Sequence, residues 1–198
     1  MPRPVLYATV GAVVIGLLVG VVRGGSIARL AQLPVRLAWL AGLAWLIQVV
    51  LFTSPLGASL DRWAAAIHLA SIVLVGIVIV ANRAMPGVAL FGLGLLLNAV
   101  VITANGGFMP VSDAALAAVG NDVRSEVLER GERTQKSVLM RPDSPLWVLG
   151  DVLPVPPLKK VYSIGDLVAA VGAALMVSQG MGTRSARHPE QRAASRPG

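Results

Sequence analysis

Residues 97–112 read LNAVVITANGGFMPVS, and this stretch decides how the rest of the chain is organised. An apolar run that already carries an amide, Asn98, stops on Asn105-Gly106-Gly107 instead of on charged residues. Glycine permits positive φ and close backbone approach, and asparagine tolerates the left-handed conformation. We therefore expect a helix that ends here and folds back sharply. The simplest interpretation of these residues is a C-terminal cap, and the functional one is a turn that shapes the mouth of a site.

The composition around this stretch is that of a membrane protein. Of 198 residues, 55% are hydrophobic and only 14% are charged, with a mean hydropathy of +0.72. A soluble domain typically has about 25% charged residues. The chain has no cysteine and only two histidines, which excludes a disulfide framework, a thiolate nucleophile and a Cys- or His-cluster metal site. We expect no cofactor.

Five apolar segments are long enough to cross the roughly 30 Å hydrocarbon core of a bilayer. The sequence therefore predicts an all-α, polytopic membrane protein with one membrane domain, residues 1–181, an outer connection, residues 105–162, and a basic, disordered cytoplasmic tail, residues 182–198. The predicted spans are Pro4–Val22, Val35–Phe52, Trp63–Ala81, Pro86–Ala104 and Ser163–Met181.

The net charge of +7 comes largely from arginines that flank these segments, which is typical of topology signals and not of a nucleic-acid interface. Arg23, Arg29 and Arg36 follow the first segment without an acidic residue, and four arginines follow the fifth. The positive-inside rule then places the N-terminus outside and the C-terminus in the cytoplasm. Lys159 and Lys160 oppose this orientation, but they belong to a long connection whose charges balance.

A ridge of small residues marks one face of the first segment. Ala12, Gly16 and Gly20 recur every four residues, as in packed membrane helices. We interpret this ridge as a helix-packing surface.

The connection between the fourth and fifth segments has a pattern of its own. From Ser112, a suitable N-cap, apolar residues recur at helical spacing up to Gly131, a suitable C-terminal cap. This amphipathic element lies either on the bilayer surface or across the mouth of the bundle, and a plain surface helix fits the pattern equally. The proline-rich residues 142–157 that follow exclude a regular helix, and Leu146–Leu153 suits an interfacial or re-entrant segment.

Polar residues of four segments fall at one depth. Because successive helices alternate in direction, Gln48, His68, Asn98 and Asp166 all lie in the third of the membrane nearest the outer connection. Polar side chains in hydrocarbon normally face the bundle or water, so these four suggest a shared polar pocket. The alternative is that each is an interhelical hydrogen bond, with Asp166 and Ser163 capping the fifth helix. Residues at the same end that we add to the pocket are Asn105, Gly106, Gly107, Asp151 and Ser163.

Established catalytic motifs are missing from the sequence. It has no P-loop, dinucleotide-binding fingerprint, nucleophile elbow or His-Glu-x-x-His motif. Asp151 and Asp166, each preceded by glycine, could instead hold a divalent cation and through it a lipid phosphate. Such an enzyme needs the two carboxylates within about 6 Å of each other or of a shared ion.

Four motifs occur together in this chain: VRGGS at Val22–Ser26, NGGFMPVS at Asn105–Ser112, LGDVLPVPP at Leu149–Pro157 and YSIGD at Tyr162–Asp166. In this order and spacing they resemble the bacterial membrane family known as domain of unknown function 5317. The resemblance extends to about Ser178 and implies a small integral membrane protein of the bacterial plasma membrane. It implies no activity, substrate or catalytic residue, and Gln48 and His68 belong to none of its motifs.

The leading functional hypothesis is a non-enzymatic binding, transport or accessory protein. Its ligand would be a small molecule or an ion in the polar pocket. The lipid bilayer would surround it, and a membrane-protein partner is compatible with this hypothesis. Nucleic acid is not expected as a partner. If it transports, Asp166 or Asp151 is the expected proton- or cation-linked group. The alternatives are a membrane enzyme acting on a lipid or isoprenoid phosphate through Asp151 and Asp166, and a structural scaffold.

Overall fold

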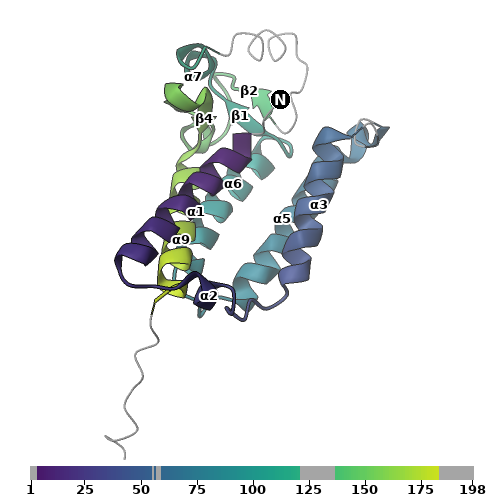
Figure 1. Ribbon diagram of the computed structural model, residues 1–198. Coiled ribbons are helices and arrows are strands. Elements are labelled where there is room, and N and C mark those ends of the chain that lie inside the picture. The colour runs from purple at the N-terminus through teal and green to yellow at the C-terminus, as the bar shows by residue number, and fades with distance from the viewer. Residues whose placement is uncertain (1–3, 55, 57–58, 121–136, 183–198) are drawn as a thin grey trace, which may run out of the picture.

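The computed structural model describes residues 4–54, 56, 59–120 and 137–182. This part of the chain is mostly helical (Figure 1). The five long helices begin and end within three residues of the predicted bounds, whereas the short helices were not predicted as such, apart from the start of α7. The helices are α1 (Pro4–Val22), α2 (Ile27–Leu30), α3 (Ala38–Thr53), α5 (Ala64–Ala81), α6 (Val88–Ala104), α7 (Asp113–Ala118) and α9 (Ile164–Gly180).

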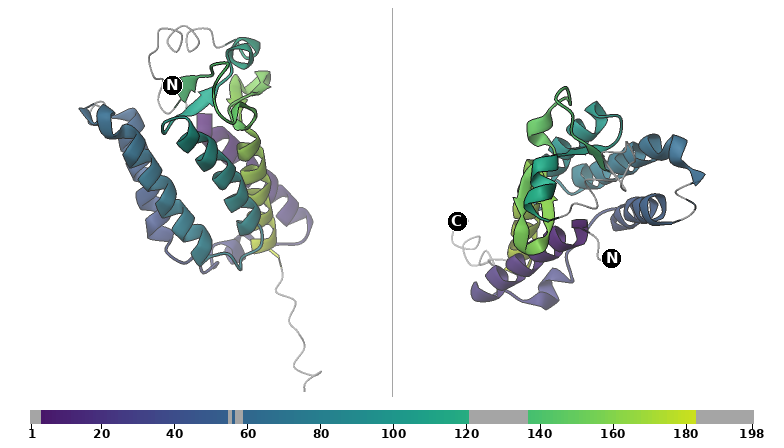
Figure 2. Two further views of the ribbon diagram at one scale, coloured as in Figure 1. Left: turned by 180° about the vertical axis from the view of Figure 1, so that it is seen from behind. Right: turned by 90° about the horizontal axis from the view of Figure 1, so that it is seen from above.

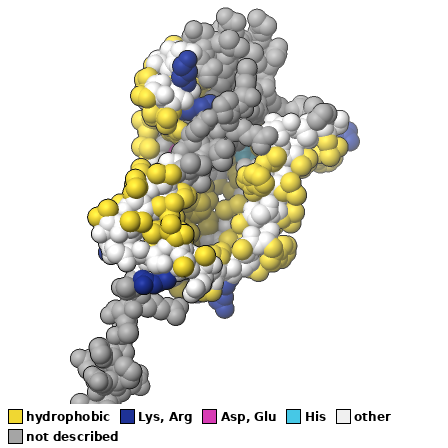
Figure 3. Space-filling view, in the orientation of Figure 1, with side chains coloured by type: hydrophobic (Ala, Val, Ile, Leu, Met, Phe, Trp, Pro, Cys, Tyr) yellow, Lys and Arg dark blue, Asp and Glu magenta, His cyan; other side chains and the backbone are white. Residues whose placement is uncertain are grey.

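The long helices form two packed groups. Helix α9 lies between α6 and α1, and α3 packs along α5, whereas the contact between α5 and α6 is much smaller (Figures 1 and 2). On α1, a Cβ added to Gly16 would lie 2.8 Å from Ala174 O, and one added to Gly20 would meet Met181. The ridge on the first helix is therefore confirmed as a packing surface. Figure 3 shows a hollow between the two groups.

Four short strands lie above the helices in the described part of the connection, which we call the cap (described residues of 105–162). Strand β1 (Met109–Val111) pairs in parallel with β2 (Ser137–Leu139), and β3 (Leu153–Val155) pairs antiparallel with β4 (Lys160–Tyr162). The prediction of an all-α chain is wrong here. Prolines exclude helix but permit short extended pieces at the edge of a sheet, and two of these strands contain one.

The end of helix α6 is a Schellman motif. The N–H of Gly107 donates to Ile102 O at 2.8 Å, and the N–H of Gly106 donates to Thr103 O at 3.3 Å. Gly106 has φ +70° and Gly107 has φ +91°, both in the left-handed region. A Cβ on Gly107 would lie 2.8 Å from Ala65 Cα, so the second glycine also lets α6 turn against α5. The C-terminal helix cap and the sharp turn of the chain expected from Asn105-Gly106-Gly107 are both confirmed.

The cap has a small core of its own. Val111, Ala115, Leu116, Val119 and Val161 are buried together. The Ser112 hydroxyl accepts from Ala115 N–H, which confirms it as the N-cap of α7. Residues 121–136 lie outside the described part, and with them the rest of the predicted amphipathic helix and Gly131. The predicted disordered tail also lies outside it from residue 183 onward.

Two segments of the chain bear on membrane insertion. Among the described residues, helix α5 is long and apolar enough to cross a membrane, with a mean hydropathy of 2.6, and only 17% of it is buried. Leu146–Leu153 is not a spanning segment: it contains the single 3-10 turn Trp147–Leu149, and Trp147 is exposed. Four further apolar helical stretches are shorter: Gly11–Val22, Ala38–Thr53, Val88–Ala104 and Ile164–Gly180.

Candidate functional site

The structure joins three of the predicted site residues directly. The Asn98 side-chain amide on α6 donates to Asp166 Oδ1 at 2.8 Å, and the Ser163 hydroxyl donates to Asn98 Oδ1 at 2.8 Å. Ser163 and Asp166 also bond each other's backbone N–H, at 2.9 and 3.2 Å, which makes a capping box at the start of α9. We call Asn98, Ser163 and Asp166 the polar triad. It links α6 to the first turn of α9.

The close approach of α6 and α9 depends on glycines. A Cβ on Gly165 would overlap Asn98 Oδ1 and lie 2.7 Å from Gly94 O. A Cβ on Gly94 would in turn overlap the backbone of Gly165 and Ala169. The glycine of the SIGD motif is therefore required because Asn98 occupies the space where a side chain would be.

Tyr162, the residue before the triad serine, was not predicted as a site residue from the sequence. Its phenol oxygen is buried and has no hydrogen-bond partner among the described residues. Burial raises the pKa of Tyr162 above its ordinary value of 10.0, and the negative charge of Asp166 raises this pKa further. The sequence did contain a signal for Tyr162, because a tyrosine directly before an N-cap serine lies at the entrance of the helix.

Gln48 and His68 belong to a second polar group, between α3 and α5. The Gln48 amide donates to the Ser71 hydroxyl at 3.0 Å, and Ser71 donates to His68 O at 2.6 Å. His68 is 2% exposed, and its Nδ1 lies 3.0 Å from Gly107 O. A carbonyl only accepts, so Nδ1 carries the proton in this contact. This group holds α3 to α5 and ties α5 to the turn after α6.

Asn105 and Asp151 lie in the cap. The Asn105 amide donates to Val101 O at 2.8 Å and to Pro145 O at 2.9 Å, which holds the proline-rich segment over the end of α6. The backbone of Asp151 exchanges hydrogen bonds with Pro110 and Ser112 in a bridge to β1. The predicted residues are thus distributed over the triad, the second group and the cap.

The chemistry of the triad suits a small polar ligand or a cation. Asn98 and Asp166 are partly exposed, whereas Ser163 and Tyr162 are buried. The carboxylate oxygens keep lone pairs beyond the two bonds they accept, and the Tyr162 hydroxyl has a donor to offer. The described residues contain no group of three or more His, Cys, Asp or Glu placed to hold a metal ion.

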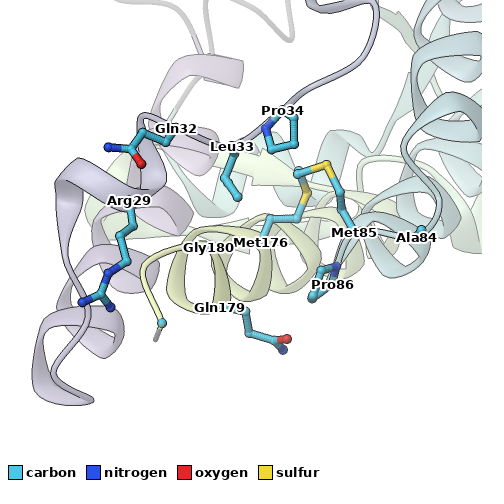
Figure 4. Close-up of a pocket in the computed structure, with 11 residues that line it drawn as sticks. Arg29, Gln32, Leu33, Pro34, Ala84, Met85, Pro86, Met176, Gln179 and Gly180 are labelled. Atoms are coloured by element: carbon cyan, nitrogen blue, oxygen red, sulfur yellow. The ribbon is translucent and has the colours of Figure 1, made fainter. Parts of the chain in front are cut away.

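Two cavities lie at the opposite end of the molecule, which we call the α2 end. The first, of about 740 Å³, lies between α2, the α5–α6 turn and the end of α9. Leu33, Met85 and Met176 gather at its centre, while Arg29 and Gln179 lie at its edge (Figure 4). The second, of about 720 Å³, runs along α5 and includes Arg36 and Arg83. Neither cavity was predicted from the sequence.

The α2 end also contains a buried amide that was not predicted from the sequence. Asn82 is 6% exposed and ends helix α5. Its side chain accepts from Arg36 N–H at 2.8 Å and donates to Arg36 O at 2.8 Å. This reciprocal pair fixes the chain before α3 against the end of α5. In the sequence, Asn82 resembles an ordinary polar residue beside the flanking Arg83.

Comparison with known proteins supports the resemblance noted in the sequence. Residues 32–178 match a family model described as "Family of unknown function (DUF5317)". The match ends where the resemblance was expected to end, while the VRGGS motif at Val22–Ser26 precedes it. No curated protein and no solved structure matches the chain.

Proposed function

We propose that this chain, which belongs to the family of unknown function DUF5317, is a multi-pass protein of the bacterial plasma membrane. In this proposal it binds a small polar molecule or a cation without catalysing a reaction. The polar triad and Tyr162 form the site, at the outer end of the bundle. The observation that carries the proposal is the buried Tyr162 hydroxyl, which has no partner among the described residues and senses the charge of the partly exposed Asp166.

The exposed side chains of the long helices support insertion of all five. Each helix has a large hydrophobic residue that is more than half exposed. In water, an apolar surface of this kind would promote aggregation. The exposed fractions are 61% for Leu18, 67% for Trp39, 62% for Val73, 59% for Leu96 and 54% for Val171. In lipid the same side chains are solvated. Figure 3 shows the corresponding surface, with basic side chains towards the two ends and hydrophobic ones between them.

The helix lengths are compatible with spanning. The five helices have 16 to 19 residues, or about 24 to 29 Å at about 1.5 Å per residue. Flanking residues and local thinning of the bilayer accommodate a shortfall of a few Å. The positive-inside rule orients the α2 end, with Arg29, Arg36 and Arg83, towards the cytoplasm. The cap and the triad then face outward.

A scaffold is the second candidate function, and the closed bonding of the triad favours it. Each polar atom of the Asn98 side chain has a partner within the triad, so these residues also serve as a connection between α6 and α9. The two functions differ in one respect. A binding site must admit water, whereas a connection of this kind is stable when dry.

Substituted cysteines distinguish the two, because the chain has no cysteine of its own. We expect Asn98→Cys and Asp166→Cys to react with a positively charged, membrane-impermeant methanethiosulfonate applied from outside. Val100→Cys, on the same helix and 45% exposed in the structure, is the matched control. It should stay unreactive because lipid covers it. Asn98→Cys and Asp166→Cys should each be labelled at least about tenfold faster than Val100→Cys, which corresponds to a free-energy difference of about 1.4 kcal/mol.

Each other outcome contradicts part of the proposal. Equal, slow reaction of all three cysteines would mean that the triad is dry and would leave the scaffold. Fast reaction of Val100→Cys would mean that this face of α6 is in water and would contradict membrane insertion. Circular dichroism of each variant shows whether the helices are retained.

A further inference from the structure

Two arginines at the α2 end line the same cavity as an apolar stripe of helix α5. Val73, Gly76, Ile77 and Val80 are spaced so that they share one face of α5, and they line the cavity of about 720 Å³. Arg36 and Arg83 line the same cavity at the end of the stripe, where the helix itself ends. The cavity therefore combines an apolar wall along the helix with positive charge at one end.

Hydrogen bonds fix the backbone positions of the two arginines. The buried Asn82 side chain holds the backbone N–H and C=O of Arg36, each at 2.8 Å. Arg83 is the next residue in the chain, and its N–H donates to Val80 O at 3.4 Å. The hydrogen bonds of one amide thus bring an arginine from before α3 next to an arginine that follows α5.

The charge of the cavity is uncompensated by its own lining, which includes no acidic residue. Both arginine side chains are exposed, and neither guanidinium has a hydrogen bond or ion pair among the described residues. Arg29 in the neighbouring cavity differs, because its guanidinium lies 3.5 Å from Met181 O. Guanidinium groups suit phosphate, since each offers a planar fork of donors.

We propose that Arg36 and Arg83 bind the phosphate of an anionic glycerophospholipid, with an acyl chain along Val73, Ile77 and Val80. This rests on the proposed membrane insertion, but not on the polar triad. Basic pockets at the cytoplasmic side of membrane helices bind anionic head groups in this way. The volume of the cavity also lies in the range of small-molecule sites, about 300 to 1,000 Å³.

The test measures lipid binding to the purified full chain in mild detergent by native mass spectrometry. The probes are phosphatidylglycerol and phosphatidylcholine. We expect saturable binding of phosphatidylglycerol and at least about tenfold weaker binding in Arg36→Gln/Arg83→Gln, the value for loss of a charge-assisted hydrogen bond. Arg23→Gln, an exposed arginine outside the cavity, is the matched control and should bind as the parent does.

A second pair of variants tests the apolar wall without changing charge. Gly76 lines the cavity and a Cβ added to it meets nothing within 4 Å, so Gly76→Leu starts a bulky side chain from an open position on the cavity wall. Gly42 on α3 is equally open and lies outside the cavity, which makes Gly42→Leu its control. We expect Gly76→Leu to weaken phosphatidylglycerol binding by at least about fivefold, and Gly42→Leu to leave it unchanged.

The proposal is overturned if the double arginine variant binds phosphatidylglycerol as the parent does. It is also overturned if Arg23→Gln weakens binding as much, because any surface charge would then suffice. Displacement of the lipid by inorganic phosphate at equal concentration would mean that the site takes free phosphate. Loss of binding in the arginine variants together with unreactive Asn98→Cys would leave the lipid site intact and remove only the triad as a ligand site.

Discussion

Gly94→Ala is expected to lower the free energy of unfolding by about 2 to 3 kcal/mol, within the range for overpacking a tightly packed contact. The added methyl group would overlap the backbone N of Ala169 and the carbonyl oxygen of Gly165, and neither belongs to a side chain that could rotate away. Helix α9 must therefore move away from α6. That movement also lengthens the bond between Asn98 and Asp166.

Gly42→Ala is the matched control for this substitution. Gly42 lies within α3, and a Cβ there meets nothing within 4 Å. Alanine favours a helix over glycine by up to about 1 kcal/mol, so this variant should be equal to the parent or slightly more stable. Unfolding of both variants in mixed micelles, followed by circular dichroism, measures the difference. Equal stability of the two would contradict the glycine-mediated contact of α6 with α9.

Asp166→Ala is expected to lower the free energy of unfolding by about 3 kcal/mol, because it removes the reciprocal bond of the capping box at the buried Ser163 and the acceptor of the Asn98 amide. The substitution removes the acceptor of the Asn98 amide and the acceptor of the Ser163 N–H. Leu167→Ala is the control, because Leu167 is the next residue and is 51% exposed. It should cost well under about 1 kcal/mol if lipid surrounds it.

Asp166→Asn tests the electrostatic part of the same site. The substitution removes the negative charge that helps to raise the pKa of Tyr162, so the phenol should titrate closer to 10.0 than in the parent. In the parent, the raised pKa stabilises the folded protein below pH 10.0, and this contribution is lost as the pH rises through the folded-state pKa. Absorbance at 295 nm in a Tyr7→Phe background follows Tyr162 alone. An unchanged titration would contradict the proximity of the two groups.

The sequence was sufficient for the long helices because hydropathy over 16 to 19 residues is a strong local signal. It was also sufficient for the turn after α6 and for the capping box, since the residues of Asn-Gly-Gly and Ser-x-x-Asp determine the local backbone geometry without contacts from distant segments. The shared depth of Asn98 and Asp166 follows from helix direction alone, and the structure joins these two directly.

Features that depend on contacts between distant segments could not be predicted. Depth placed Gln48 and His68 beside Asn98, but depth does not say which helices are neighbours, and α3 packs on α5 instead. Strand pairing in the cap joins residues 109–111 to 137–139, across a segment that carries no local strand signal. The bonds between Asn82 and Arg36 likewise join residues 46 positions apart.

The central proposal is that five helices span the membrane, with the cap outside and the polar triad at the outer end of the bundle. Labelling of single cysteines in intact bacterial cells by a membrane-impermeant maleimide tests it directly, since the parent chain is free of cysteine. We predict that Thr53→Cys and Asp143→Cys are labelled in intact cells, and that Gln32→Cys and Ala84→Cys are labelled only after the membrane is permeabilised. Labelling of Gln32→Cys and Ala84→Cys in intact cells, or recovery of the chain in the soluble fraction, would contradict the account.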